Sequence, residues 1–284
     1  MSATASPARR LRLPLTGAIG AAVLAFWLVV AVLAPWIAPY SEGHLVSPDI
    51  LGPMSWAFPF GTDYLGRDML SRVLLGTPIT VGVSLAATLL ACLAGVTLAL
   101  AAAARGGWLD AVLSRVLDAV ISLPSLLFGL VVVASLGASM TVLIVTAAVI
   151  YTPGAYRTAR ALAVNINALD FVTVARARGE GDLFIMREEI LPNMVLPVLT
   201  DFGLRFVYVV LLLSGLSFLG LGIQPPYADW GSLVRENMEG LVDGSPAVIM
   251  PAIAIATLTI GVNLLIDHLP TRRGTGHGGA GHER

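Results

Sequence analysis

Residues 73–104 read VLLGTPITVGVSLAATLLACLAGVTLALAAAA and contain no charged side chain. A helix needs about 20 mostly apolar residues to cross the hydrocarbon core of a bilayer, so this run is long enough to span one. Four further uncharged runs exceed that length: residues 13–41, 119–156, 206–228 and 244–266. The chain of 284 residues is 56% hydrophobic and 12% charged, about half the ~25% charge content of soluble domains. These features predict an integral membrane protein.

The run 119–156 is too long for one span, and Gly137-Ala138-Ser139 within it predicts a tight turn between two helices. Backbone groups in lipid must be hydrogen-bonded within the protein, so we expect an all-α fold. The first apolar run exceeds the roughly 7–15 residues of a cleavable signal and predicts a retained span. Six spans are predicted: 16–38, 79–103, 120–136, 141–156, 204–223 and 246–266.

All 17 basic residues are arginine, and their distribution predicts the orientation of the spans. Cytoplasmic loops of membrane proteins carry an excess of basic residues. With the N-terminus inside, the cytoplasmic segments hold Arg9, Arg10, Arg12, Arg105, Arg115, Arg157, Arg160, Arg176, Arg178, Arg187, Arg205, Arg272, Arg273 and Arg284. The outer segments hold only Arg67, Arg72 and Arg235. We therefore expect both termini and the loop 157–203 to be cytoplasmic.

The longest charge-dense stretch lies in that loop, where residues 170–193 read DFVTVARARGEGDLFIMREEILPN. Glycine is costly inside a helix and favoured at its C-terminal boundary. The stretch therefore predicts two short helices separated at Gly179-Glu180-Gly181. A cytoplasmic loop with its own helices is a plausible contact for a soluble partner.

Several function classes are disfavoured by what the chain lacks. A phosphate-binding P-loop needs a lysine, and the chain has none, so any ATP that drives it is hydrolysed by another polypeptide. An intramembrane serine protease could use Ser217, but no histidine lies at membrane depth to act as its base. A secondary transporter usually keeps ionisable residues in its spans, and the uncharged runs contain none. The four histidines are isolated and Cys92 is alone, so we expect no metal site. We expect no nucleic-acid partner.

Small residues form two stripes within the spans. They are Ala87, Ala91, Gly95, Ala99 and Ala103 in the second span, and Ser214, Gly215, Ser217, Gly220 and Gly222 in the fifth. Small residues let helices approach closely in membranes. Packing within the bundle is the favoured interpretation, and a translocation path or subunit seam is the alternative.

A polar segment precedes the second span and contains Gly61, Thr62, Asp63, Gly66, Arg67 and Asp68. Asp63 and Arg67, like Asp68 and Arg72, have the spacing of helical ion pairs with the acid first. We therefore expect an amphipathic helix on the outer face.

Four segments in order resemble the C-type permease subunits of dipeptide, oligopeptide and nickel ABC importers. The first, from Phe60 to Arg72, is similar to the family pattern FGTDxxGRDxxSR. The second is RVLDAVISLPSLLFG at 115–129. The third is the cytoplasmic loop, which looks like the permease EAA loop. The fourth, LSFLGLGIQPPYADWG at 216–231, is similar to LSFLGLGxQPPxxxWG. The resemblance covers roughly residues 58–268.

In the EAA-like loop, Thr173 stands at the glutamate position of the motif, followed by Val174 and Ala175. The resemblance implies an ATPase-coupling role for this loop; the expected residues are Asp170, Thr173, Ala175, Gly179, Leu191 and Pro192. The fourth segment, together with Ser214 just before it, adds pathway or packing candidates at Ser217, Gly220 and Gly222. Its paired prolines are expected to end the fifth span at the outer surface, and Trp230 to lie at the membrane interface.

The resemblance implies a type I ABC importer permease fold with three regions. We expect residues 1–77 to hold the N-terminal tail, first span and outer loop, 78–268 the permease core with five spans, and 269–284 a disordered tail. The family implies a multi-pass protein of the bacterial inner membrane. Its partners would be a homologous permease, two ATP-binding subunits that hold ATP and Mg, an extracytoplasmic solute-binding protein and lipid. A peptide is the expected substrate, with nickel or another small solute as alternatives.

Overall fold

The computed structural model describes residues 14–268. It is a bundle of helices, and those residues contain no β-strand beyond two isolated bridges. The predicted tail 269–284 lies outside the described residues, as do Arg9, Arg10 and Arg12. The elements are α1 (Leu15–Ile37), α2 (Met69–Arg105), α3 (Gly107–Ile121), α4 (Ser125–Leu136), α5 (Met140–Asn167), α6 (Asp170–Ala177), α7 (Asp182–Phe184), η1 (Ile185–Ile190), α8 (Leu191–Leu216), η2 (Ser217–Leu221), α9 (Trp230–Glu236), η3 (Met238–Leu241) and α10 (Pro246–Ile266).

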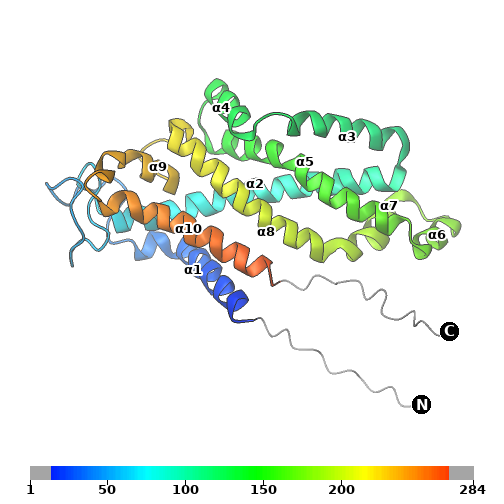
Figure 1. Ribbon diagram of the computed structural model, residues 1–284, viewed down its shortest axis with the longest axis horizontal. Coiled ribbons are helices and arrows are strands. Elements are labelled where there is room, and N and C mark those ends of the chain that lie inside the picture. The colour runs from blue at the N-terminus through cyan, green and yellow to red at the C-terminus, as the bar shows by residue number, and fades with distance from the viewer. Residues whose placement is uncertain (1–13, 269–284) are drawn as a thin grey trace, which may run out of the picture.

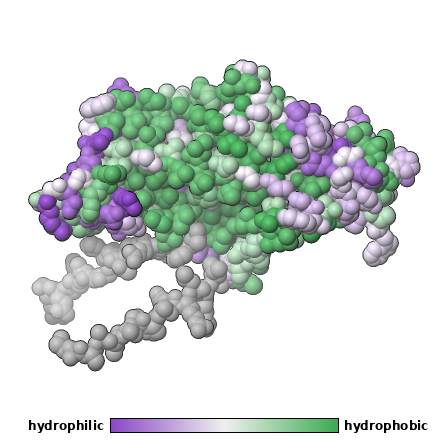
Figure 2. Space-filling view, turned by 180° about the vertical axis from the view of Figure 1, so that it is seen from behind, coloured by the Kyte–Doolittle hydropathy of each residue, from purple (hydrophilic) through white to green (hydrophobic). Residues whose placement is uncertain are grey.

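The long helices run side by side along the length of the molecule (Figure 1). Helices α1 and α10 pack together on one side, while α2, α5 and α8 form the centre. The loop before α2 gathers with α9 at one end, and α6 and α7 lie at the other end. Figure 2 shows a hydrophobic surface between two ends that carry the hydrophilic residues, as expected for a protein that crosses a membrane.

Among the described residues, four helical segments are long and apolar enough to cross a membrane. They are α1, α2, the continuous stretch Asp182–Leu221, and α10. A fifth is reached if α3 and α4 are counted as one span bent by 84°. The structure therefore confirms the all-α prediction but not the count of six spans.

The third predicted span, 120–136, needs correction. The helix there breaks at Ser122-Leu123-Pro124, and α4 has only 12 residues. At 1.5 Å per residue α4 is about 18 Å long, shorter than the ~30 Å hydrocarbon core. A proline disfavours helical geometry in the residue before it, which explains the break at this point. The predicted turn at Gly137–Ser139 is confirmed, because α4 ends at Leu136 and Gly137 adopts a φ of +88°.

Arg205, which was counted with the cytoplasmic arginines, lies near the start of the predicted fifth span. It is a buried residue of α8. The ionisable groups of this chain are therefore not confined to its loops.

The small-residue stripe of α2 packs against α5. Ala87, Ala91 and Ala99 have no exposed surface. A Cβ added to Gly95 would lie 2.6 Å from the Cβ of Ala155, so only glycine allows this approach of the two helices. Packing within the bundle is thereby confirmed for this stripe, in agreement with the role of small residues between membrane helices.

Candidate functional site

The charge-dense cytoplasmic-loop sequence forms a compact turn of helices at one end of the molecule (Figure 1). Helix α6 ends at Ala177, Gly179 has a φ of +89°, and α7 begins at Asp182. The amide of Glu180 donates to the carbonyl of Ala175 at 3.2 Å, which closes the C-terminal turn of α6. The predicted break at Gly179–Gly181 is therefore present, but only the first helix is short, because the helix that begins at Asp182 continues to Leu221.

One face of α6 is anchored in the bundle. Val172 is buried in a cluster with Ile185, Ile190 and Met194, and Ala175 is buried on the same helix. Arg176 Nη2 donates to the carbonyl of Ala104 at 2.8 Å and ties α6 to the end of α2. This packing joins α6 to α2 and α8.

The other face of the turn is exposed and partly apolar. Val174 is 51% exposed and Leu183 75% exposed, with Phe171 and Phe184 beside them. Of the residues that sequence reasoning selected, Asp170, Thr173 and Gly179 are exposed on this turn, while Ala175 faces inward. Leu191 and Pro192 form the first turn of α8. The structure brings these six residues into one region at the end of the bundle.

At the opposite end, a buried ion cluster is centred on Asp63. The Asp63 carboxylate, with no exposed surface, accepts from Arg67 Nε at 2.6 Å and from Arg72 Nη1 at 2.9 Å. Arg72 Nη1 also donates to Glu236 of α9 at 2.7 Å. The cluster joins the loop before α2 to α9, although 164 residues separate Arg72 from Glu236.

The outer amphipathic helix predicted for this segment is wrong. Residues 61–68 form a tight loop, because Gly61 and Gly66 adopt φ values of +70° and +78°. Asp68 does not pair with Arg72; it caps the N-terminus of α2 by accepting from the amide of Ser71 at 2.9 Å. Two glycines with left-handed backbone interrupt any helix here.

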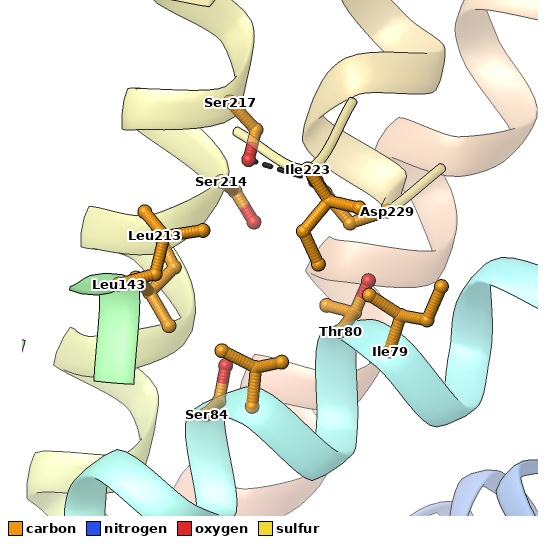
Figure 3. A pocket seen from close by; sticks show the side chains of 10 residues that line it. Ile79, Thr80, Ser84, Leu143, Leu213, Ser214, Ser217, Ile223 and Asp229 are labelled. Atoms are coloured by element: carbon orange, nitrogen blue, oxygen red, sulfur yellow. Dashed lines mark hydrogen bonds between the residues drawn. The ribbon is translucent and has the colours of Figure 1, made fainter. Parts of the chain in front are cut away.

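A second polar group lies beside the fifth-span stripe, where η2 meets α9 (Figure 3). Ser217 donates to Asp229 at 2.8 Å, and the carboxylate also accepts from the amides of Gly231 and Ser232 at the start of α9. Ser214 faces the same small cavity of about 20 Å³, a volume that suits about one water molecule. Gly222 approaches Ser217 so closely that an added Cβ would lie 2.1 Å from its hydroxyl oxygen.

Sequence reasoning missed Asp229 and misplaced Trp230. Trp230 is fully buried, stacks edge-on against Trp27 and donates from Nε1 to the carbonyl of Val73 at 3.1 Å. Its ring is therefore packed inside the bundle and is not exposed to lipid, in contrast to the expected interfacial position. The fifth span ends at Leu221 after Gly220, whose φ is +92°, and not at the paired prolines 225–226. The Asp-Trp-Gly-Ser sequence carried one usable signal, since aspartate is a favoured helix N-cap.

Burial raises the pKa of the Asp229 carboxyl above its ordinary value, and the hydrogen bonds from Ser217 and from the start of α9 offset this only in part. A raised folded pKa means that the stability contributed by this group is present at low pH and is lost as pH rises through the folded pKa. Asp229→Asn cannot ionise and keeps an oxygen for the α9 amides. We expect its Tm to match the wild type near pH 4 and to exceed it by a few degrees near pH 8.

The measurement is thermal unfolding of the detergent-purified assembly between pH 4 and 8. The matched control is Asp243→Asn, because Asp243 is exposed in the nearby loop after η3. A Tm difference for Asp229→Asn that is constant with pH, or that matches the control, would contradict the expectation.

Comparison with known proteins found similarity to one family and to several transport proteins. Residues 95–274 match the family described as "Binding-protein-dependent transport system inner membrane component". A putative peptide transport system permease protein of Brucella suis biovar 1 is 34% identical over 92% of this chain and 88% of its own length. A dipeptide transport system permease protein of Haemophilus influenzae is 34% identical over 87% of this chain and 86% of its own length. A glutathione transport system permease protein of Escherichia coli is 34% identical over 92% of this chain and 86% of its own length. A crystal structure of an amino acid ABC transporter with histidines aligns with 70% of this chain and 92% of its own at a TM-score of 0.48 and 19% identity.

Proposed function

This chain belongs to the family of binding-protein-dependent transport system inner membrane components, and we propose that it forms, with a homologous permease, the membrane pathway of an ATP-driven peptide importer. One observation carries the substrate class. The relatives named above as peptide, dipeptide and glutathione permeases align over most of both chains. The chain is a multi-pass membrane protein with no lysine for a P-loop, so the ATP is hydrolysed by partner subunits.

The turn formed by α6 and α7 is the proposed contact with an ATP-binding subunit. Its exposed apolar residues, Val174 and Leu183 among them, offer a surface for a soluble partner. Its inner face is fixed to α2 and α8, so a displacement of α6 is passed to the long helices. Transport coupling requires a mechanical contact of this kind, because the energy is released in a different chain.

Within this turn, Asp170 and Thr173 are the proposed exposed contacts, and Ala175 holds α6 on the bundle. Gly179 provides the reversal, and Leu191-Pro192 starts the helix that would receive the motion. The outer loop with Gly61, Thr62, Asp63, Gly66, Arg67 and Asp68 is the proposed scaffold for the surface that meets a solute-binding protein. The surface around Ser214, Ser217, Gly220 and Gly222 is proposed to hold α9 against the bundle. Residues 1–77, 78–268 and 269–284 are the proposed regions of the chain.

Purification of the tagged chain in mild detergent tests the function. We expect a second permease and two ATP-binding subunits to co-purify, and the reconstituted assembly to take up labelled dialanine when ATP and the solute-binding protein are supplied. The isolated polypeptide should hydrolyse no ATP. An assembly that imports nickel or another solute but neither a small peptide nor glutathione would contradict the substrate class.

The arginine distribution further supports a cytoplasmic position for both termini and for α6 and α7. We expect a cysteine at position 183 to react with a membrane-impermeant maleimide only from the cytoplasmic side, and one at 242 only from outside. Leu183 is 75% and Val242 92% exposed, and the single natural cysteine, Cys92, is buried and would be replaced by serine. Reaction of both positions from the same side would overturn this orientation.

A further inference from the structure

Arg205 and Asp201 form a largely buried ion pair one helical turn apart in α8. Their side chains are only 10% and 17% exposed. Arg205 Nε donates to Asp201 Oδ2 at 2.6 Å and Arg205 Nη2 to Asp201 Oδ1 at 2.9 Å. Ionisable residues buried among the helices of membrane proteins often mark pathways and ligand sites.

The pair leaves one amino group of the guanidinium available. Nη2 also donates to Thr158 at 3.2 Å, whereas Nη1 has no hydrogen-bond acceptor among residues 14–268. Nη1 lies against Gly154 of α5, and a Cβ added there would approach it to 2.3 Å. Glycine at this position therefore makes room for the guanidinium, and Nη1 remains an unused donor at the surface of the helix pair.

That donor borders a groove of about 450 Å³ at the break between α3 and α4, a size typical of small-ligand sites. Tyr151 and Tyr208 supply stacked rings with centroids 6.4 Å apart. Tyr151 donates its hydroxyl hydrogen to the carbonyl of Tyr208 at 2.9 Å, so its oxygen can still accept a hydrogen bond. The groove is lined by Pro124, Phe128, Tyr151, Gly154, Arg205 and Tyr208, among others.

The chemistry of these groups selects a ligand class. Asp201 neutralises the charge of Arg205, so the groove offers a directional donor and carries no net positive charge from the pair. Apolar and aromatic walls with a few placed polar groups suit a small molecule that has carbonyl oxygens, amide hydrogens and short side chains. A di- or tripeptide has these groups.

We propose that this groove is a peptide-binding site on the translocation pathway, where Arg205 Nη1 donates a hydrogen bond to a carbonyl or carboxylate oxygen of the peptide. The proposal rests on the proposed function and adds to it a site between α4, α5 and α8. Asp201 and Gly154 act as positioning residues, because they hold the guanidinium in place.

Photo-crosslinking in the reconstituted assembly tests this site. Tyr208, which is 49% exposed, is replaced by p-benzoylphenylalanine, and the assembly transports radiolabelled dialanine under illumination. The control places the same group at Leu199, which is 54% exposed and lies nine residues away, on the opposite side of α8. We expect the labelling of the chain to be about tenfold higher at 208 than at 199.

Arg205→Lys keeps a positive charge for Asp201 but removes the planar guanidinium and its second amino group. We expect it to lower the labelling at 208 and the uptake per ATP hydrolysed by about tenfold, as for the loss of a hydrogen bond from a charged donor. The matched control is Arg157→Lys, whose pair with Asp118 at 2.6 Å is more than half exposed and lies outside the groove. Thermal unfolding of both variants checks that the assembly is intact.

The outcomes separate this site from the proposed function. Three results would overturn the site alone. The first is labelling at 208 that is no higher than at 199 while uptake proceeds. The others are labelling at 208 that Arg205→Lys leaves unchanged, and capture of the second permease in place of the peptide. Failure of the wild-type assembly to import any peptide would overturn both. Dialaninamide, which lacks the terminal carboxylate, identifies the oxygen that accepts from Arg205. Labelling at 208 equal to that by dialanine would identify a peptide carbonyl, and loss of labelling with the amide alone would identify the terminal carboxylate.

Discussion

Asp63→Ala should destabilise the outer end of the molecule by about 3–5 kcal/mol, the usual cost of removing one partner from a buried ion cluster. The substitution leaves Arg67 and Arg72 with only Glu236, in a site where their side chains are 9% and 3% exposed. It also removes the acceptor for the amides of Leu65 and Arg67, which shape the loop. A decrease in Tm on the order of 10 °C is expected, measured by thermal unfolding of the purified assembly.

Asp118→Ala is the matched control for this substitution. It removes an aspartate from an ion pair whose side chains are 52% and 55% exposed, so we expect a loss below about 1 kcal/mol. If both variants lowered the Tm by the same small amount, the cluster around Asp63 would contribute no more stability than an exposed ion pair. Such a result would contradict its role in joining the outer loop to α9.

Gly179→Val should abolish most peptide uptake while the permease remains folded. Gly179 has a φ of +89°, a conformation that a β-branched residue adopts only with strain of about 1–3 kcal/mol. No atom lies within 4 Å of an added Cβ, so the strain is in the backbone and does not come from a clash within this chain. The strain would open the last turn of α6. The population of the docking-competent conformation would then fall roughly tenfold or more.

Gly181→Val provides the comparison two residues away. Gly181 is also exposed with open space around it, but its φ of −80° and ψ of 164° suit any residue. Assembly, ATP hydrolysis and uptake are measured together for both variants. Loss of uptake at 179 but not at 181, with either lost ATPase association or futile hydrolysis, agrees with coupling through α6. Wild-type uptake and stimulation of hydrolysis in Gly179→Val would remove this turn from the mechanism.

Local features of the sequence were sufficient for the class of fold and for several boundaries. Uncharged runs of more than 20 residues predict helices in lipid, because each helix satisfies its own backbone hydrogen bonds. The reversals at Gly137 and Gly179 could also be predicted, because the preference of glycine for a left-handed backbone depends on the residue itself. The family also followed from short motifs read in order along the chain, and the comparison confirmed it.

Local reasoning from spacing was right for one pair and wrong for the other. Asp63 and Arg67 form the expected ion pair at 2.6 Å. The i,i+4 pattern of Asp68 and Arg72 predicted a helical pair, whereas Arg72 bonds to Asp63 and to the distant Glu236. Aromatic character suggested an interfacial Trp230, whereas the ring is buried against Trp27. The bend at Ser122–Pro124 shortened a span that composition alone made appear continuous.

The sequence by itself thus determined that this chain is a helical membrane protein, which family it belongs to, and where its glycines reverse the backbone. These properties depend on composition and on neighbours within one or two turns of helix. Only the tertiary structure decided the partners of the outer arginines, the burial of Asp229 and Trp230, and the placement of Arg205 beside Gly154 and the two tyrosines. Each of these depends on the packing of segments far apart in the chain, which creates the low-polarity surroundings and close approaches that give a charged or aromatic side chain its role.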